Sequence, residues 1–347
     1  MQHIGIGKIG QFRNTIKSVV QRTTCIYNVA TKTYKKDLSL TPPKLTFTGT
    51  VKAHGTCAGI TLKGEDYYPL SKNNVISVTN DNAGFAWFAH SPNIKNYILT
   101  TLRNIRADNS FSVDTAVTIF GEWCGGSIQK GVALNQLNKL WLPFGIKITP
   151  PNPEIPSYWL DFSKYTITNT PLRIFDIKTF ECYEAEIDFN NPELSINNLI
   201  ELTGKVESEC PIGKYFDVLG TGEGIVWTHL NKDGSLDRFK VKGGKHSVTK
   251  VKKLTSVNTE KLESINAFID YALTENRLLQ AAENTLQLII DEYDFDRKNL
   301  GAFIKWITKD VYTEEVDTLK ENNLDMKDIG NQLSKRSREW FFKQEVK

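Results

Sequence analysis

The sequence lacks any apolar run long enough to span a membrane. Its longest apolar runs, such as residues 85–89, fall far short of the roughly 20 residues that a bilayer requires. The first 14 residues also lack the apolar core and the cleavage site of a secretory signal. We therefore expect a cytoplasmic protein with no membrane partner.

The five cysteines are widely spread and form no C-x-x-C pair, and no histidine cluster lies near them. This spacing argues against a zinc site and a disulfide framework, and it favours free thiols in a reducing compartment. An excess of charge is also missing, because 43 Lys and Arg against 40 Asp and Glu leave a net charge of +3. Mean charge therefore predicts no polyanionic partner, and only a local concentration of charge would indicate one.

The composition supports two folded domains. A chain of 347 residues is long for one domain, for which roughly 150 residues is typical. Its 40% hydrophobic and 11% aromatic residues suffice for a core and exclude a wholly disordered chain. Residues 44–254 contain short runs of alternating apolar and polar residues, separated by Gly, Asn, Asp and Pro. This pattern predicts a mixed α+β domain with a largely antiparallel sheet over residues 1–254.

Residues 255–347 differ from residues 44–254 in composition and in the spacing of their apolar residues. They contain no proline and two glycines, and apolar residues such as Leu262, Ile265, Phe268 and Ile269 recur at helical spacing. We therefore expect an all-helical C-terminal domain over residues 255–347.

Five short strings in residues 52–242 carry side chains suited to phosphate chemistry. A lysine before a glycine turn, as at Lys52, can project its amine into a cleft while the backbone at Gly55 approaches a nucleotide closely. Taken alone, the same string is as readily a surface turn. Two lysines at 240 and 242 lie on one face of a strand. In chain order the strings are Lys52-Ala53-His54-Gly55-Thr56, Phe120-Gly121-Glu122, Phe175-Asp176, Glu223-Gly224 and Lys240-Val241-Lys242.

This ordered set resembles the covalent nucleotidyltransferase superfamily of polynucleotide ligases and mRNA capping enzymes. It is most similar to the phage RNA ligase 2 family, because of His54 in the first string, the segment 126–130, Ser247 and the lead-in at residues 11–14. The resemblance runs from about residue 8 to the C-terminus. It implies an antiparallel-sheet, ATP-grasp-like ligase domain, a helical RNA-binding domain, a monomer and, for a phage gene, the host cytoplasm.

The resemblance also implies the chemistry. Lys52 would attack the α-phosphorus of ATP and become linked to AMP. A lysine with an ordinary pKa of about 10.4 is protonated at neutral pH, so Lys52 needs like charge from Lys240 and Lys242 and a desolvated site. The same two lysines would neutralise phosphate charge in the transition state. His54 would serve chemistry at the phosphate end, or else stiffen its turn.

The remaining candidates would bind the nucleotide, again by resemblance. Glu122 would bind the ribose, Phe175 would stack on adenine, and Glu223 would ligate Mg²⁺ or Mn²⁺, which prefer carboxylate and phosphate oxygens. Gly55 would let the backbone approach the nucleotide. Lys72 stands where the family usually has an arginine, so it keeps the positive charge and loses the bidentate geometry.

Two basic regions are candidates for RNA contact. Residues 238–253 hold seven Lys and Arg and no acidic residue, which suits phosphate binding or, alternatively, a solvated hinge. Arg277 and the basic residues beside Trp340 suit the shape of an RNA duplex, or form ordinary helix surface around a buried tryptophan. Apolar neighbours predict core positions for five other tryptophans: Trp87, Trp123, Trp141, Trp159 and Trp227.

We therefore expect an ATP-dependent RNA ligase that joins 3′-hydroxyl and 5′-phosphate ends through lysine-AMP and RNA-adenylate intermediates, with a role in RNA repair. The expected substrate is nicked duplex RNA, with a tRNA-like break and an RNA–DNA hybrid as alternatives. Rival functions are a DNA ligase, an mRNA-capping-type nucleotidyltransferase and a non-catalytic RNA-binding relative. The helical tail argues against a capping enzyme, and the complete set of charged residues argues against a non-catalytic relative.

Overall fold

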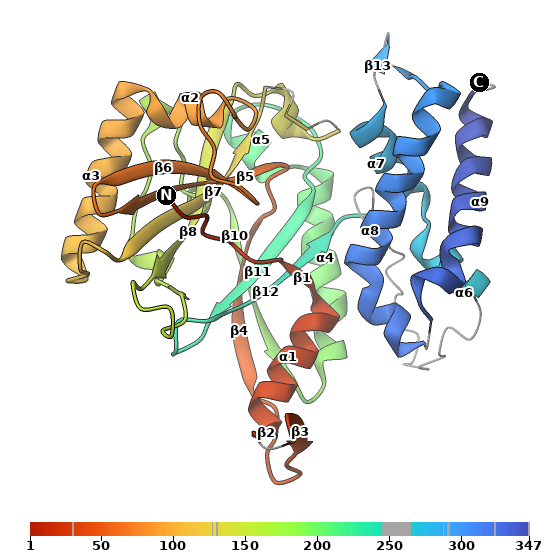
Figure 1. Ribbon diagram of the computed structural model, residues 1–347, viewed down its shortest axis with the longest axis horizontal. Coiled ribbons are helices and arrows are strands. Elements are labelled where there is room, and N and C mark those ends of the chain that lie inside the picture. Colours follow the sequence, from red (N-terminus) through yellow and green to blue (C-terminus); the bar gives the residue numbers. More distant parts are fainter. Residues whose placement is uncertain are drawn as a thin grey trace. The chain divides into compact units, whose positions relative to one another are not determined.

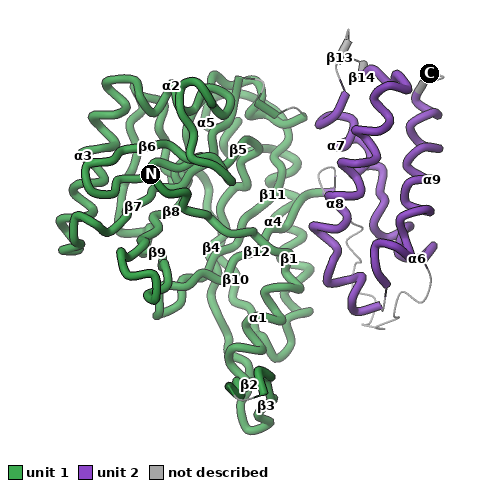
Figure 2. The backbone as a smooth tube through the Cα atoms, in the orientation of Figure 1, with its two compact units in different colours: residues 1–243 green, residues 244–347 purple. Residues whose placement is uncertain are grey.

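A computed structural model describes all of residues 1–347 except 30, 127, 130, 245–264, 287, 290, 291, 323, 346 and 347. The chain forms two compact units, Met1–Gly243 and Gly244–Lys347 (Figure 2). The boundary that the sequence predicts, between residues 254 and 255, lies outside the described residues.

Unit 1 is built around two five-stranded sheets (Figure 1). The first has the order β1-β12-β11-β4-β10, in which only the short β1–β12 pair is parallel. The second has the order β6-β5-β7-β8-β9 and is antiparallel throughout. These sheets confirm the expected α+β class with mainly antiparallel pairing. The strands of the first sheet are β1 (Gly10–Gln11), β4 (Lys44–Val51), β10 (Cys182–Asp188), β11 (Gly224–Leu230) and β12 (Leu236–Lys242). Those of the second are β5 (Gly55–Lys63), β6 (Asp66–Ser71), β7 (Ala116–Cys124), β8 (Leu140–Thr149) and β9 (Tyr158–Trp159).

Helices cover both sheets. The helix α3 begins with proline, which suits the first helical position, and its Ile94, Ile98, Leu102 and Ile105 form one buried face against β5 and β7. The helices of unit 1 are α1 (Phe12–Thr24), α2 (Phe85–His90), α3 (Pro92–Asp108), α4 (Ile196–Ser208) and α5 (Pro211–Tyr215). Short 3-10 turns span Ala133–Gln136, Phe162–Lys164, Thr170–Leu172, Ile177–Thr179 and Pro192–Ser195. A small hairpin of β2 (Cys25–Asn28) and β3 (Thr33–Lys36) follows α1.

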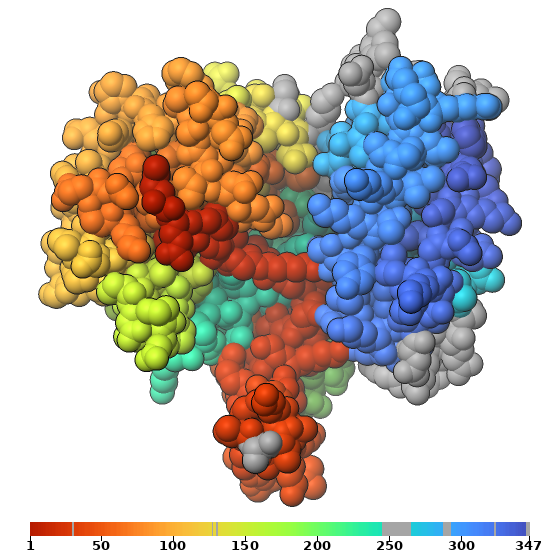
Figure 3. Space-filling model, in the orientation of Figure 1, coloured from red at the N-terminus to blue at the C-terminus, as the bar shows by residue number. Residues whose placement is uncertain are grey.

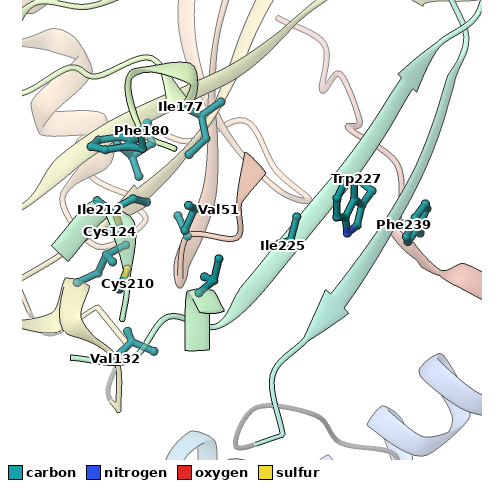
Figure 4. Packing of buried hydrophobic residues seen from close by; sticks show 14 of the residues in the cluster. Val51, Cys124, Val132, Ile177, Phe180, Cys210, Ile212, Ile225, Trp227 and Phe239 are labelled. Atoms are coloured by element: carbon teal, nitrogen blue, oxygen red, sulfur yellow. The ribbon is translucent and has the colours of Figure 1, made fainter. Parts of the chain in front are cut away.

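The core of unit 1 fixes the strands that carry the charged strings. Val51, Ile225, Trp227 and Phe239 come from β4, β11 and β12 and pack in one buried cluster (Figure 4). Burying side chains of this size stabilises the fold by about 1.5–3 kcal/mol each. The ends of these three strands are therefore held rigidly relative to one another.

The described part of unit 2 is helical apart from one short ladder. Its core includes Phe268, Phe303, Ile307 and Phe341. The expectation of an all-helical domain is corrected by β13 (Leu288–Ile289), which pairs antiparallel with β14 (Glu292–Tyr293). The helices are α6 (Ile265–Ala272), α7 (Glu275–Thr285), α8 (Leu300–Glu321) and α9 (Met326–Glu345), with a 3-10 turn at Arg297–Asn299.

Arg277 in α7 is wholly buried rather than available to RNA. Its guanidinium donates to Asp310 at 2.9 Å and to Glu315 at 3.3 Å, and it also reaches the carbonyl of Ala272. The surface role that the sequence suggested for Arg277 is therefore wrong. Trp340 packs parallel to Phe303 in the helical core. Within the described residues, no helix is long and apolar enough to cross a membrane.

Candidate active site

The first charged string lies where the chain passes from one sheet to the other. Strand β4 ends at Val51 in the first sheet, and β5 begins at Gly55 in the second, so residues 52–54 are the link. The N–H of Lys52 donates to the carbonyl of Gly224 at 2.8 Å, which extends the β4–β11 pairing by one step. This bond places Lys52 beside Glu223, the residue before β11.

Gly224 makes that approach possible. Its φ is +148°, and a Cβ at this position would lie 2.2 Å from the carbonyl oxygen of Val241. Only glycine fits such a close approach between β11 and β12. The Glu223-Gly224 string is thus explained by a backbone requirement beside a functional side chain.

The carboxylate of Glu223 is the centre of the site. It is 2% exposed, and its Oε2 accepts from Lys52 Nζ at 2.5 Å, while its Oε1 accepts from Lys242 Nζ at 2.9 Å. His54 Nδ1 lies 2.8 Å from Oε2, and a carboxylate only accepts, so this nitrogen carries the proton. Burial by itself raises the pKa of Glu223, but Lys52, Lys242 and His54 outweigh burial and hold that pKa well below its ordinary value. Glu223 is therefore ionised and joins three groups into one cluster.

Glu122 behaves in the opposite way. It stands opposite Cys57 in the β5–β7 ladder and accepts from the N–H of Gly55 at 3.1 Å. Burial raises the pKa of Glu122 to about 7, with Lys52 opposing and Glu223 adding to the rise. Two carboxyl groups of the same site thus differ in protonation at neutral pH, a property typical of catalytic sites.

Gly55 is required by its neighbours as well. A Cβ on Gly55 would lie 2.3 Å from the carbonyl oxygen of Trp123, so a larger residue would push β5 away from β7. The adjacent Thr56 is held by Asn82, whose amide donates to its hydroxyl at 3.1 Å. Asn82 lies in the loop before α2, and its sequence distance from Thr56 gave no signal of this contact.

The remaining lysines extend the positive charge around the two carboxyls. Lys240 and Lys242 lie on the same side of β12, and Lys240 is held between Val226 of β11 and Gln11 of β1 in the ladder. Both are partly buried. Lys72 is exposed after β6 and close enough to Glu122 to lower the pKa of that carboxyl. The structure therefore brings together the charged residues from four of the five strings.

Phe175 is the exception among the candidates. It is 1% exposed and packs in the core of unit 1, with ring centroids 5.1 Å from Phe216 and 6.1 Å from Tyr215. Its stacking on adenine stays a prediction. Ser127, Lys130 and Ser247, which belong to the resemblance, lie outside the described residues, as do residues 245–253 of the basic segment.

One tryptophan also departs from expectation. Trp87 is 65% exposed, because α2 turns Phe85, Ala86 and Ala89 inward and leaves Trp87 outside. Its predicted core position is therefore wrong. The predicted core positions of the other four hold, since each is at most 8% exposed: Trp123, Trp141, Trp159 and Trp227.

The donor groups of the site bear on metal binding. Among the described residues, no three or more His, Cys, Asp or Glu side chains are gathered as a metal site. Glu223 offers the hard oxygens that Mg²⁺ or Mn²⁺ prefers, but both oxygens already accept from cationic or histidine groups. These oxygens would suit such an ion only if Lys52 or Lys242 turned away, so metal binding by Glu223 stays a prediction.

Comparisons with known proteins give similarity at the level of structure. No family model matches the chain, and no curated protein matches it. Among solved structures, an RNA ligase of Naegleria gruberi with PPi has a TM-score of 0.42 at 14% identity, over 69% of this chain and 56% of the ligase. A variant of that ligase with ATP and manganese has a TM-score of 0.40 at 13% identity, over the same shares of the two chains. The chain thus matches little more than half the length of these ligases.

Proposed function

We propose that the protein is an ATP-dependent RNA ligase in which Lys52 carries AMP. The observation that supports this most strongly is the buried Glu223 carboxylate, which holds the amines of Lys52 and Lys242 at 2.5 and 2.9 Å. A nucleophilic lysine with a second lysine at this distance suits chemistry at a phosphate. The proposed enzyme is a cytoplasmic monomer that acts on nicked duplex RNA in repair.

In the first proposed step, the Lys52 amine forms a bond to the α-phosphorus of ATP, and the bond to pyrophosphate breaks. The ammonium of Lys52 must lose a proton first. The ion pair with Glu223 favours the protonated form, whereas Lys242 and partial burial favour the neutral amine. Triphosphate binding must therefore draw Lys52 away from Glu223. A divalent ion bound with ATP would supply further charge neutralisation at the phosphates.

In the later steps, AMP passes from Lys52 to the 5′-phosphate of RNA, and the 3′-hydroxyl then displaces AMP to form the phosphodiester. Lys240 and Lys242 stay next to the reacting phosphates because β12 fixes both. Lys72 contributes charge at the exposed edge. His54 is oriented by Glu223 and is available to the phosphate end. These are roles of position and charge, which account for most of phosphoryl transfer catalysis.

The alternatives are separated by nucleotide and acceptor. A capping-type enzyme would use GTP, a DNA ligase would seal DNA, and a non-catalytic relative would bind RNA without reaction. The Lys52–Glu223–Lys242 cluster favours catalysis over the last of these.

Labelling with a radioactive α-phosphate tests the proposal. The protein is incubated with labelled ATP or GTP and Mg²⁺ or Mn²⁺, then separated by denaturing electrophoresis. We expect label from ATP on the wild type and none on Lys52→Ala. Lys164→Ala, which changes an exposed lysine of the same unit, is the matched control. Label retained on Lys52→Ala would place the nucleophile elsewhere.

A further inference from the structure

The β2–β3 hairpin projects from unit 1 as a separate knob below α1 (Figures 1 and 3). Tyr27 and Tyr34 stand opposite each other in its ladder, with ring centroids 4.9 Å apart. They are 46% and 56% exposed, so the pair presents aromatic surface to solvent. A cross-strand aromatic pair stabilises a hairpin, which explains why these two strands pair. Pairing alone does not require that both rings be so exposed.

Positive charge surrounds these rings. Lys32, Lys35 and Lys36 are all exposed, and Lys36 shares a face with Tyr34 because the two are two residues apart on β3. The one acidic residue of residues 25–40, Asp37, has its carboxylate engaged by the N–H and hydroxyl of Ser39. Aromatic faces between lysines complement a nucleic acid strand, in which stacked bases alternate with phosphates.

The base of the hairpin is fixed to the sheet that carries the active-site lysines. Asp37 N–H donates to the carbonyl of Thr24, the last residue of α1, at 2.8 Å. Arg22 in the same last turn forms two hydrogen bonds to the buried Asp237 of β12, at 2.9 and 2.8 Å. The knob is therefore held at a set position relative to Lys240 and Lys242.

The distance from the hairpin to Lys52 can be estimated from the length of β4. This strand starts at Lys44, eight residues after the last residue of β3, and ends at Val51 beside Lys52. Its eight residues span about 25 Å at roughly 3.3 Å per residue. At roughly 3.4 Å per nucleotide of a stacked strand, that span corresponds to about seven nucleotides.

We propose that the β2–β3 hairpin is a second RNA-binding site, which holds a single-stranded part of the RNA about seven or more nucleotides from the join. Tyr27 and Tyr34 stack on bases, and Lys32, Lys35 and Lys36 contact phosphates. The relation to the join rests on the proposed ligase function, whereas the binding of RNA to the hairpin does not.

The experiment uses the full chain and measures RNA binding and self-adenylation separately. Fluorescence anisotropy with a labelled 24-nucleotide RNA and a 6-nucleotide RNA is compared among the wild type and the Phe, Leu and Ala double variants of Tyr27 and Tyr34. We expect Ala and Leu to weaken binding of the long RNA by at least about 30-fold, because two stacking positions are lost, and Phe to retain binding because its ring still stacks. The short RNA, bound at the active site, should show no change.

A second variant tests the charge. Changing Lys32, Lys35 and Lys36 together to Gln should reduce the slope of log K against log salt by about two, at roughly 0.7 per phosphate contact of a single strand. Leu194→Ala, an exposed apolar residue elsewhere in unit 1, is the control and should change nothing. Thermal denaturation of unit 1 should change little in every variant, because its core clusters contain no residue of the hairpin.

Each other outcome overturns the inference. Unchanged binding of the long RNA in the Ala variant would show that the hairpin does not bind RNA. Full binding of the long RNA by the Leu variant would show that the rings do not stack on bases, and it would indicate that the hairpin is an apolar docking surface for a protein. Equal losses for both RNA lengths place the contact at the active site. Self-adenylation should be normal in all variants, and its absence from the wild type would count against the proposed ligase without bearing on the hairpin.

Discussion

Replacing Glu122 by Gln should make stability less dependent on pH. In the folded protein, burial raises the pKa of this carboxyl from 4.5 to about 7. Between these values the folded state holds a proton that the unfolded state has lost, so the contribution of Glu122 to stability is greatest below pH 4.5 and falls as pH rises to about 7. A tenfold change in proton affinity equals about 1.4 kcal/mol, so the full loss is about 3 kcal/mol.

Glutamine cannot ionise but keeps an oxygen for the N–H of Gly55. Glu122→Gln should therefore gain about 3 kcal/mol on wild type when pH is raised from 4.5 to 8. The assay is urea denaturation at both pH values, followed by tryptophan fluorescence, to which unit 1 contributes five of the seven tryptophans. Glu65→Gln, at an 88% exposed residue, is the control and should gain little.

An equal difference in stability between Glu122→Gln and wild type at both pH values would contradict this prediction. Glu122 would then titrate near its ordinary pKa, and the site would be wetter than its burial indicates. The two carboxyls of the site would lose their distinction in protonation.

In single-turnover assays, Lys240→Gln or Lys242→Gln should lower the rate of adenylation or AMP transfer by orders of magnitude, and Arg at either position should partly restore it. Wild-type rates in both Gln variants would show that the two lysines form only a basic surface. Arg277→Met should destabilise unit 2 by about 3–5 kcal/mol, because two acidic residues would lose their arginine partner. Urea denaturation would show this loss as a transition at lower urea concentration. A fragment ending at Thr255 should still become labelled by ATP. It should seal RNA at least about 100-fold more slowly, since joining depends on the positioning of the two RNA ends. Sealing at the full rate would show that the helical unit is dispensable.

Fold class and the order of the charged strings can be read from the sequence alone. Alternation predicts mainly antiparallel sheets, and β4 and β10 do bury alternate residues toward their C-terminal ends. Strands β5 and β7 do not alternate, because successive residues are buried on both faces of their sheet. Gly55 and Gly224 were visible as glycines next to charged residues, and the structure supplies the reason, a backbone approach that no Cβ allows. Helical spacing likewise located α6 and α7, but not the ladder between α7 and α8.

Which charges meet depends on packing between residues that are far apart in the sequence. Lys52 and Glu223 are 171 residues apart, and the register of β4 against β11 brings them to 2.5 Å. The same kind of long-range packing buries Arg277 and exposes Trp87, against their local patterns. Burial and neighbouring charges then give Glu122 and Glu223 opposite pKa shifts, although the two residues are chemically identical. Composition sets what a side chain can do, whereas its neighbours in three dimensions set its charge.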